Sequence, residues 1–365
     1  MFFYFQPLYL QQLGADPVAI GAIMGAYGAA MAVAHFPAGY LSDRIGRRPL
    51  LWASYFLGLT AVWIMALAAN ASIFIAGMLL YGFTYFVLTP MNSYASAARG
   101  SLTISQAIML ISGTFNFGMV FGPLLGGFVG EQWGLQRIYL VAGFFFFAST
   151  LLVLFLHPQP VEHHPTSHAR ISFLGNKRYV IYLTAVFIVV FSTYLPQSLS
   201  QVFLENERGL SLATIGLLTS MAGLGTAGLN LVFSRFNNRS AFMLAQAAVG
   251  GFAFLIWQGM SLPWYALGYF LLGGYKSTRS LATAQVRSLI PSNQMGTAYG
   301  VLETAGSTAT ILAPVAAGLL YTHNPTWIFS GCIVLVTFSL IISYFLSPSP
   351  SISLHPDSAA VSPEE

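Results

Sequence analysis

The amino-acid sequence predicts an all-α integral membrane protein. Hydrophobic residues make up 56% of the 365-residue chain, charged residues make up only 7%, and the mean hydropathy is +0.70. Soluble domains carry about 25% charged residues, so most of this apolar surface must lie in lipid. The apolar residues form long continuous runs without the alternation of barrel strands, and only helices satisfy the backbone of such runs inside a bilayer.

Eleven apolar runs are long enough to cross a bilayer, and we expect each to form a helix. Short polar connections separate most of them, and a longer polar stretch, His157 to Arg178, divides the first five from the last six. The expected spans are Val18–Tyr40, Leu50–Ala69, Ser72–Met91, Ile104–Gly130, Ile138–Leu156, Tyr179–Leu204, Leu212–Phe233, Ala241–Gly259, Pro263–Ala284, Thr297–Leu320 and Trp327–Leu346.

The first ten residues, Met1 to Leu10, are apolar and aromatic but too short to span a membrane. Ten helical residues reach about 15 Å, which is half of a bilayer core. The segment also lacks the basic leader and the small-residue cleavage site of a signal peptide. We interpret it as the outer half of a first helix that is truncated in this chain.

The basic residues predict the orientation of the chain in the membrane. The net charge is +4, and ten of the 14 Lys and Arg residues fall in or beside alternate loops: Arg44, Arg47, Arg48, Arg99, Arg170, Lys177, Arg178, Arg235, Arg239 and Arg287. The opposite loops hold only Arg137 and Arg208. By the positive-inside rule, the richer loops, the linker and the C-terminal tail are cytoplasmic. The basic balance therefore reflects topology, and we expect no nucleic-acid partner.

The loop between the first two complete spans contains the densest cluster of charges in the chain. Glycines there permit close helix approach and a sharp reversal. An ordinary positive-inside turn would explain the arginines but not the aspartate and the glycines. The cluster resembles the signature of the major facilitator superfamily between its second and third helices, carried by Gly39, Leu41, Asp43, Arg44, Gly46, Arg47 and Arg48.

The two halves of the chain echo each other, which agrees with this resemblance. The segment Gly14 to Gly21 aligns with Gly209 to Gly216, and Pro123 aligns with Pro314. The second half also contains a partial repeat of the charged loop, in which Ser234 takes the place of Asp43. The resemblance implies two pseudo-symmetric six-helix bundles that rock around a midplane site. We assign residues 1–157 and 179–347 to the bundles, 158–178 to a cytoplasmic linker, and 348–365 to a disordered cytoplasmic tail.

A small-residue stripe in the span Ile104–Gly130 bears on the direction of transport. It resembles the antiporter motif of the efflux branches and comprises Gly118, Gly122, Pro123, Gly126 and Gly127. Generic helix packing explains the same stripe, and Met109 stands where the longer motif has a glycine. We therefore prefer export over uptake only slightly.

Three charges inside the expected spans point to the substrate. Lys276 and Arg279 share one helix face at i and i+3, and Glu303 lies on the next span. A bare charge in lipid costs several kcal/mol, about 2.5–3.5 kcal/mol on insertion scales, so these groups pair or face water. We expect Arg279 to pair with Glu303 and Lys276 to face a central cavity, which favours an anionic or strongly hydrogen-bonding solute. The alternative is that all three snorkel or join two helices.

Other polar residues are weaker candidates for the site. His35 is either a proton-responsive group near the inner gate or a packing element. The cavity-wall candidates are Gln106, Asn116, Tyr194 and Gln197. The linker region holds His157, His163, His164 and His168 without an ordered scaffold, so we expect no metal site.

Missing motifs narrow the function further. The sequence has no GxxxxGK[ST] loop, no HExxH and no GxSxG, so we expect neither an ATPase nor another enzyme, and no cofactor. Met78 stands where proton-coupled efflux members carry an arginine, which leaves a proton or another coupling ion open. We predict a monomeric, multi-pass secondary transporter of a small organic solute in the cell (inner) membrane. The alternatives are an uptake symporter of the same fold and a related protein that does not transport.

Overall fold

The computed structural model describes residues 1–98, 100–157, 176–286, 289–290 and 295–346; within these, the side chains at 35–45, 88–89, 93, 96, 104–105, 108 and 295–297 are not described. All regular elements in the described ranges are helices. The chain begins with a 3₁₀ turn, η1 (Phe3–Phe5), and the short helix α1 (Gln6–Gln12).

The first half of the chain continues through long helices that pack on one another. They are α2 (Pro17–Ile45), α3 (Arg47–Ala66), α4 (Ala71–Phe83) with its continuation η2 (Thr84–Val87) and α5 (Leu88–Ala97), α6 (Ile104–Trp133) and α7 (Leu135–Leu154). We call this group, together with η1 and α1, the N bundle.

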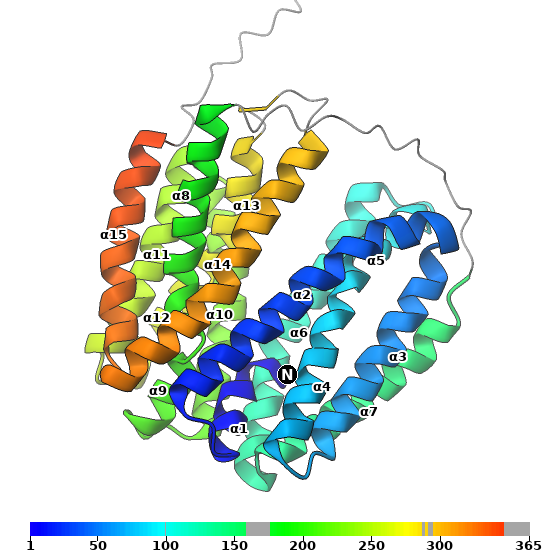
Figure 1. The fold of residues 1–365 in the computed structure, drawn as a ribbon, viewed down its shortest axis with the longest axis horizontal. Coiled ribbons are helices and arrows are strands. Elements are labelled where there is room, and N and C mark those ends of the chain that lie inside the picture. Colours follow the sequence, from blue (N-terminus) through cyan, green and yellow to red (C-terminus); the bar gives the residue numbers. More distant parts are fainter. Residues whose placement is uncertain (99, 158–175, 287–288, 291–294, 347–365) are drawn as a thin grey trace, which may run out of the picture.

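The second half repeats the arrangement and forms the C bundle. Its elements are α8 (Lys177–Tyr194), η4 (Leu195–Gln197), α9 (Ser200–Asn206), α10 (Leu212–Phe233), α11 (Asn238–Gln258), α12 (Leu262–Leu272), α13 (Gly274–Val286), α14 (Met295–His323) and α15 (Trp327–Leu346). Figure 1 shows the two bundles side by side, with their helices converging toward the end that holds α1 and α9.

Ten helical stretches in the described ranges are long and apolar enough to cross a membrane. They correspond to ten of the eleven expected spans, which confirms a multi-pass helical protein. The remaining expectation, one continuous helix over Pro263–Ala284, is wrong in detail because α12 ends and α13 begins around Gly273. A Cβ on Gly273 would overlap the backbone of Gly225 and Thr226, so the break lies where α10 crosses at backbone contact.

The chain reverses between α2 and α3 inside the expected loop, but the loop is shorter than predicted: Gly39, Asp43 and Arg44 still belong to α2, and only Gly46 separates the two helices. Gly46 adopts a φ of 83°, a left-handed conformation that favours glycine. Beyond it, the guanidinium of Arg48 lies 4.2 Å from the ring centroid of Trp52, while the Trp52 indole donates to the carbonyl of Val153 at 2.9 Å. This contact fixes the start of α3 against the end of α7.

Glycine contacts join the two bundles along two seams. In the α2–α14 seam, a Cβ on Gly25 would lie 2.7 Å from the carbonyl oxygen of Ile311. In the α6–α10 seam, a Cβ on Gly127 would lie 2.6 Å from the carbonyl oxygen of Leu212, and one on Gly216 would lie 2.9 Å from the Cα of Gly127. We call the end where these seams form the closed end.

The two seams are related by the internal repeat. A Cβ on Gly21 would meet the backbone of Pro314, and a Cβ on Gly216 would meet the backbone of Pro123. Gly21 and Gly216 are aligned in the repeat, as are Pro123 and Pro314. The repeat read from the sequence therefore produces two equivalent contacts in space.

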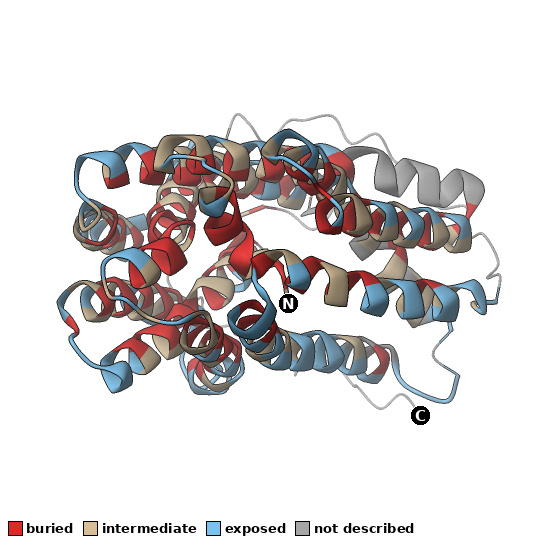
Figure 2. Ribbon diagram, turned by 90° about the horizontal axis from the view of Figure 1, so that it is seen from below, coloured by how far each residue is buried: buried red, intermediate tan, exposed pale blue. Residues whose placement is uncertain are grey.

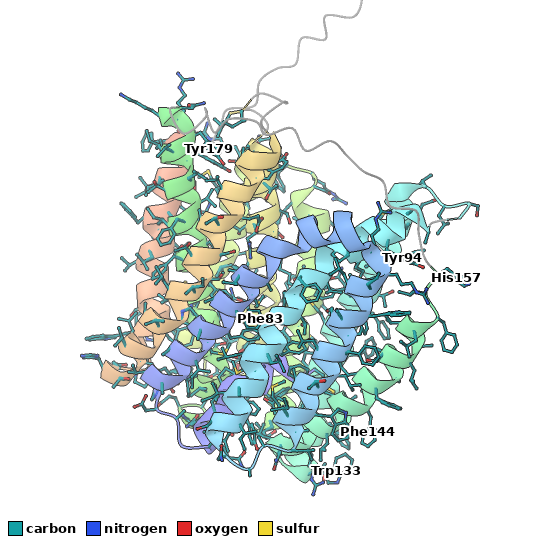
Figure 3. The ribbon with its side chains drawn as sticks, turned by 45° about the vertical axis from the view of Figure 1, so that its right-hand side comes forward. Phe83, Tyr94, Trp133, Phe144, His157 and Tyr179 are labelled. Carbon is teal, nitrogen blue, oxygen red and sulfur yellow. The ribbon has the colours of Figure 1, made fainter. Side chains whose placement is uncertain are left out.

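At the opposite end the bundles do not touch in this way. Figure 3 shows Tyr94, His157 and Tyr179 near that end, from which the chain enters the 158–175 connection; we call it the linker end. In the part of the chain that the structure describes, no atom of another element comes within 4 Å of the positions that Cβ atoms would take on Gly113 of α6 or Gly300 of α14. The seams are therefore confined to the other half of the molecule.

The outer surface is apolar, as contact with lipid requires. Exposed residues gather on the outward faces of the helices in Figure 2, and buried residues on the faces turned toward other helices. Large apolar side chains are among the exposed ones: Phe144 is 65% exposed and Leu231 is 72% exposed. A bilayer would cover these side chains.

Close backbone contact within the C bundle gives a test of the fold. A Cβ on Gly225 would lie 2.7 Å from the carbonyl carbon of Phe270, whereas one on Gly118 meets nothing within 4 Å. We expect Gly225→Ala to lower the unfolding temperature by several degrees, because overpacking typically costs about 1–3 kcal/mol. Gly118→Ala, the matched control, should leave it unchanged or slightly higher. Thermal scans of the purified protein in detergent measure both, and equal stability of the two variants would contradict the packing.

Candidate functional site

An open groove of about 740 Å³ runs along α6 toward the linker end. Its lining recurs every three or four residues: Leu102, Gln106, Met109, Leu110, Gly113, Thr114 and Phe117. The same helical stripe continues through Val120 to Gly127, where it packs on α10. One face of α6 is thus a seam near the closed end and a groove wall near the linker end. We call the open space between the bundles the cleft.

Lys276 reaches across the cleft from the C bundle to the N bundle. It lies on α13, and its Nζ contacts the sulfur of Met119 on α6. The same ammonium lies 4.9 Å from the ring centroid of Phe115, a cation–π distance. In the described part of the chain, no carboxylate lies within ion-pair distance of Lys276. Its charge is therefore held only by a thioether and an aromatic face.

Arg279 and Glu303 form the ion pair expected from their spacing. Arg279 Nη2 lies 2.5 Å from Glu303 Oε2, between α13 and α14 of the C bundle. The two side chains are 34% and 54% exposed, so the pair reaches the molecular surface. The prediction of this pairing is confirmed, while the part it takes in transport stays a prediction.

Tyrosines surround this pair on the closed-end side. The rings of Tyr194 and Tyr275 have centroids 5.4 Å apart, and the Tyr275 hydroxyl also interacts with Arg279. Tyr194 and Gln197 line a small enclosed cavity of about 50 Å³ together with Tyr4, which belongs to the N bundle. The lining of this small cavity is uncharged and comes from both bundles.

Gln106 has a structural task in addition to its place on the groove wall. Its side-chain oxygen accepts from the Thr103 amide at 2.9 Å, and Thr103 Oγ1 accepts from the Gln106 amide at 3.2 Å. This reciprocal pair is a capping box that starts α6, and the Thr-x-x-Gln spacing in the sequence could have identified it. Asn116 is half-buried on the same helix.

Several predicted switch residues fall outside the described side chains. The backbone of α2 runs through His35, Gly39, Asp43 and Arg44, but their side chains are not among those described. Their proposed functions therefore stay predictions. Arg47 and Arg48 follow directly in α3.

The glycine stripe of α6 divides into two packing faces. A Cβ on Gly122 would lie 2.8 Å from the Met1 nitrogen, and one on Gly126 would lie 2.7 Å from the Phe5 ring. Pro123 and Gly127 instead face α10. A Cβ on Gly118 would meet no other described element within 4 Å in this conformation, so its inclusion among the packing residues stays a prediction. Gly118 lies on the stretch of α6 that has already left the seam.

Sequence reasoning missed five polar residues that join elements near the cleft or the closed end. Ser277 donates to Asn230 Oδ1 at 2.7 Å between α13 and α10. Glu131 and the pair of Gln11 and Asn206 join the two bundles at the closed end. None belongs to a motif. Only the repeat, which aligns Gln11 with Asn206, carried a usable signal.

Comparison with known proteins accounts for this architecture. A family model described as Major Facilitator Superfamily matches residues 1–276 and 182–362, which together cover nearly the whole chain. The chain belongs to the major facilitator superfamily. The two overlapping matches agree with the internal repeat, and the fold expected from the loop signature is confirmed.

Two curated relatives of this superfamily chain have names that refer to different small molecules. The protein named "Probable galactarate/D-glucarate transporter GudP" of Bacillus subtilis is 24% identical over 399 residues, covering 93% of this chain and 85% of that protein. The class B tetracycline resistance protein of Escherichia coli is 24% identical over 312 residues, covering 79% and 76%.

A solved structure supports the fold independently. The crystal structure of nucleoside transporter NupG superposes with a TM-score of 0.79 at 14% identity, covering 94% of this chain and 93% of that one. Together, the family and its relatives make this multi-pass chain a secondary transporter of a small molecule rather than an enzyme.

Water access to the cleft can be tested by thiol labelling. Thr114 lines the groove, whereas Phe144 is exposed on the outer face of α7 (Figure 3). In lipid vesicles, we expect Thr114→Cys to react with a membrane-impermeant maleimide at least about tenfold faster than Phe144→Cys, because hydrocarbon excludes the reagent. The native Cys332 is buried and should give little background. Equal labelling of the two variants would show that Thr114 does not face water.

Proposed function

We propose that this chain moves a small organic anion across the membrane by alternating access, with the anion bound in the cleft beside Lys276 and Arg279. The observation that carries the proposal is the unneutralised ammonium of Lys276. The three charged side chains named above contribute two positive charges and one negative charge, which leaves the cleft with a net positive charge. A carboxylate on the solute would neutralise it.

The weak contacts of Lys276 support the proposal that its ammonium can leave them and bind a substrate instead. Its partners, Met119 and Phe115, are a weak acceptor and an aromatic face. A charge-assisted hydrogen bond to a carboxylate is stronger than either, so an incoming anion competes well for this ammonium. Because Met119 and Phe115 belong to the N bundle, such an exchange would release one contact between the bundles. Anion binding and bundle motion are thereby linked in the proposal.

The direction in which the cleft opens follows from the proposed orientation. The basic loops and the linker favour a cytoplasmic linker end, so the conformation described here would be inward-facing. Asp43, in the last turn of α2, lies at that end, and in the proposal its carboxylate contacts neighbouring helix ends only in the outward-open form. Gly122, Pro123, Gly126 and Gly127 support export over uptake by the resemblance noted above.

Ion coupling and oligomeric state belong to the proposal as well. Glu303 is the carboxylate that a coupling proton would reach most readily, since it is 54% exposed in the cleft. The monomer suffices for this scheme because both walls of the cleft come from one chain. An uptake symporter of the same fold is the second candidate. Imposing a pH gradient of either sign on reconstituted vesicles distinguishes the two by the direction of net flux.

Lys276→Gln tests the binding of the anion. We expect it to reduce transport of radiolabelled D-glucarate into reconstituted vesicles by at least about tenfold, because hydrogen bonds to charged groups contribute about 1.5–3 kcal/mol. Tetracycline serves as a second probe. The gel-filtration profile should remain that of the unaltered protein.

Lys177→Gln is the matched control, because Lys177 is exposed at the start of α8, outside the cleft. It should transport both probes normally. If Lys276→Gln transports either probe as fast as the unaltered protein, Lys276 does not bind the substrate.

A further inference from the structure

The closed end is joined by a charged contact between the bundles. The backbone N–H of Ala213, in the first turn of α10, donates to Oε2 of Glu131 on α6 at 3.0 Å. Ser211 caps the same helix from within the C bundle, since its Oγ accepts from the Thr214 amide at 3.3 Å. One of the free N–H groups of the α10 terminus thus obtains its acceptor from the other bundle.

Glu131 has an unfavourable position on its own helix. It lies in the last turn of α6, which ends at Trp133. The C-terminal end of a helix carries partial negative charge, so a carboxylate there is repelled by its own helix. The N-terminal end of α10 carries partial positive charge and supplies the compensation. Glu131 is therefore stabilised by the other bundle and only while the closed end is closed.

The equivalent position in the second seam has no such charge. Thr322 of α14 corresponds to Glu131 in the repeat, at the offset that relates Pro123 to Pro314. Its hydroxyl donates to the Gly318 carbonyl of its own helix at 2.9 Å. The start of α2 is capped within its own bundle, by Asp16 accepting from the Ala19 amide at 2.7 Å. The charged contact between bundles therefore occurs in the α6–α10 seam and not at its repeat equivalent.

A second polar contact at the closed end is neutral and symmetric. Gln11 of α1 donates to the side-chain oxygen of Asn206 on α9 at 3.1 Å. The two residues are 195 positions apart, as are Gly14 and Gly209, so they are equivalents that meet across the repeat axis. This contact adds to closure but carries no net charge.

We propose that Glu131 is a positioning residue that holds the closed end shut through its charge, and that its release from the α10 terminus is a step of the transport cycle. Glu131 does not line the cleft and does not belong to the substrate site. When the closed end opens, the α10 amide can bond to water. The carboxylate, however, stays beside the negative end of α6. The charge of Glu131 therefore favours the conformation in which the cleft opens toward the linker end.

The size of the effect follows from the exposure of the contact. Glu131 is exposed, so water and salt screen its interaction with the α10 terminus. We expect removal of the charge to raise the population open at the closed end by about three- to tenfold relative to the unaltered protein. Reversal of the charge should raise it further, because a lysine favours the end of α6 and is repelled by the start of α10.

The experiment measures distances across the closed end in the full chain, reconstituted in lipid. Spin labels at Ala69→Cys and Ser261→Cys, in a Cys332→Ala background, report on the α3–α4 and α11–α12 connections of the two bundles. Pulsed electron resonance then gives the fraction of long distances. We expect this fraction to increase from the unaltered protein to Glu131→Gln and again to Glu131→Lys. If Glu131→Lys does not fold, the comparison of Glu131→Gln with the unaltered protein is the test.

Two controls separate the contact between Glu131 and the α10 terminus, which we call the latch, from other effects. Glu207→Lys alters an exposed carboxylate at the end of α9 that makes no hydrogen bond to the N bundle within the described residues, and it should behave as the unaltered protein. Gly25→Trp forces the α2–α14 seam apart and should produce the long distance on its own.

Long distances for Gly25→Trp but none for the Glu131 variants would overturn the latch and leave alternating access standing. Equal effects of Glu207→Lys and Glu131→Lys would also overturn it. Short distances in every variant would overturn both the latch and alternating access.

Discussion

The arrangement of this transporter depends on backbone contact between four helices at one end of the molecule. Lipid tails give helices no hydrophobic reason to associate, so close packing has to supply the attraction. Glycines supply it here: Gly25 lets α2 approach α14, and Gly127 with Gly216 lets α6 approach α10. Because these contacts occupy only half the length of each helix, the other halves are free to diverge. The cleft is the consequence of that divergence.

The charged residues depend on the same contacts. Arg279 and Glu303 are paired but partly exposed, and Lys276 has no carboxylate partner in the described structure. In hydrocarbon such groups would each cost several kcal/mol, on the order of 2.5–3.5 kcal/mol on insertion scales. The proposed water-filled cleft between the diverging helix halves would make them tolerable. The seams at the closed end and the charges in the cleft are therefore two parts of one arrangement, although they share no residue.

The sequence predicted those features that arise from periodic patterns or fixed spacing. The long apolar runs predicted the helices, the loop signature predicted the family, and the spacing of Arg279 and Glu303 on consecutive spans predicted their ion pair. Features that depend on how two distant helices meet were not accessible. The break at Gly273 arises from contact with α10, and the sequence around it reads as one continuous span.

Gly118 and Glu131 illustrate the same limit on one helix. Gly118 belongs to the glycine stripe by spacing, but a Cβ there would meet no other described element within 4 Å, because the seam ends before it. Glu131 belongs to no motif, yet it reaches the start of a helix 82 positions further along the chain. Whether a side chain on α6 faces a partner, water or lipid depends on the angle between the bundles. That angle is a property of the whole assembly and cannot be obtained from local sequence.

The symmetry of the seams explains how a single contact can influence the whole molecule. The α2–α14 and α6–α10 seams are related by the repeat and lie at the same end, so the repeat axis runs from the closed end toward the linker end. In the proposed transport cycle, rocking of two rigid bundles about a pivot on that axis would open both seams together. An interaction in one seam would then act on the other without any direct connection. The glycine contacts set how closely the helices approach, so they can stay equivalent in the two seams. The polar residues set how stable the closed conformation is, so they can differ at one seam alone.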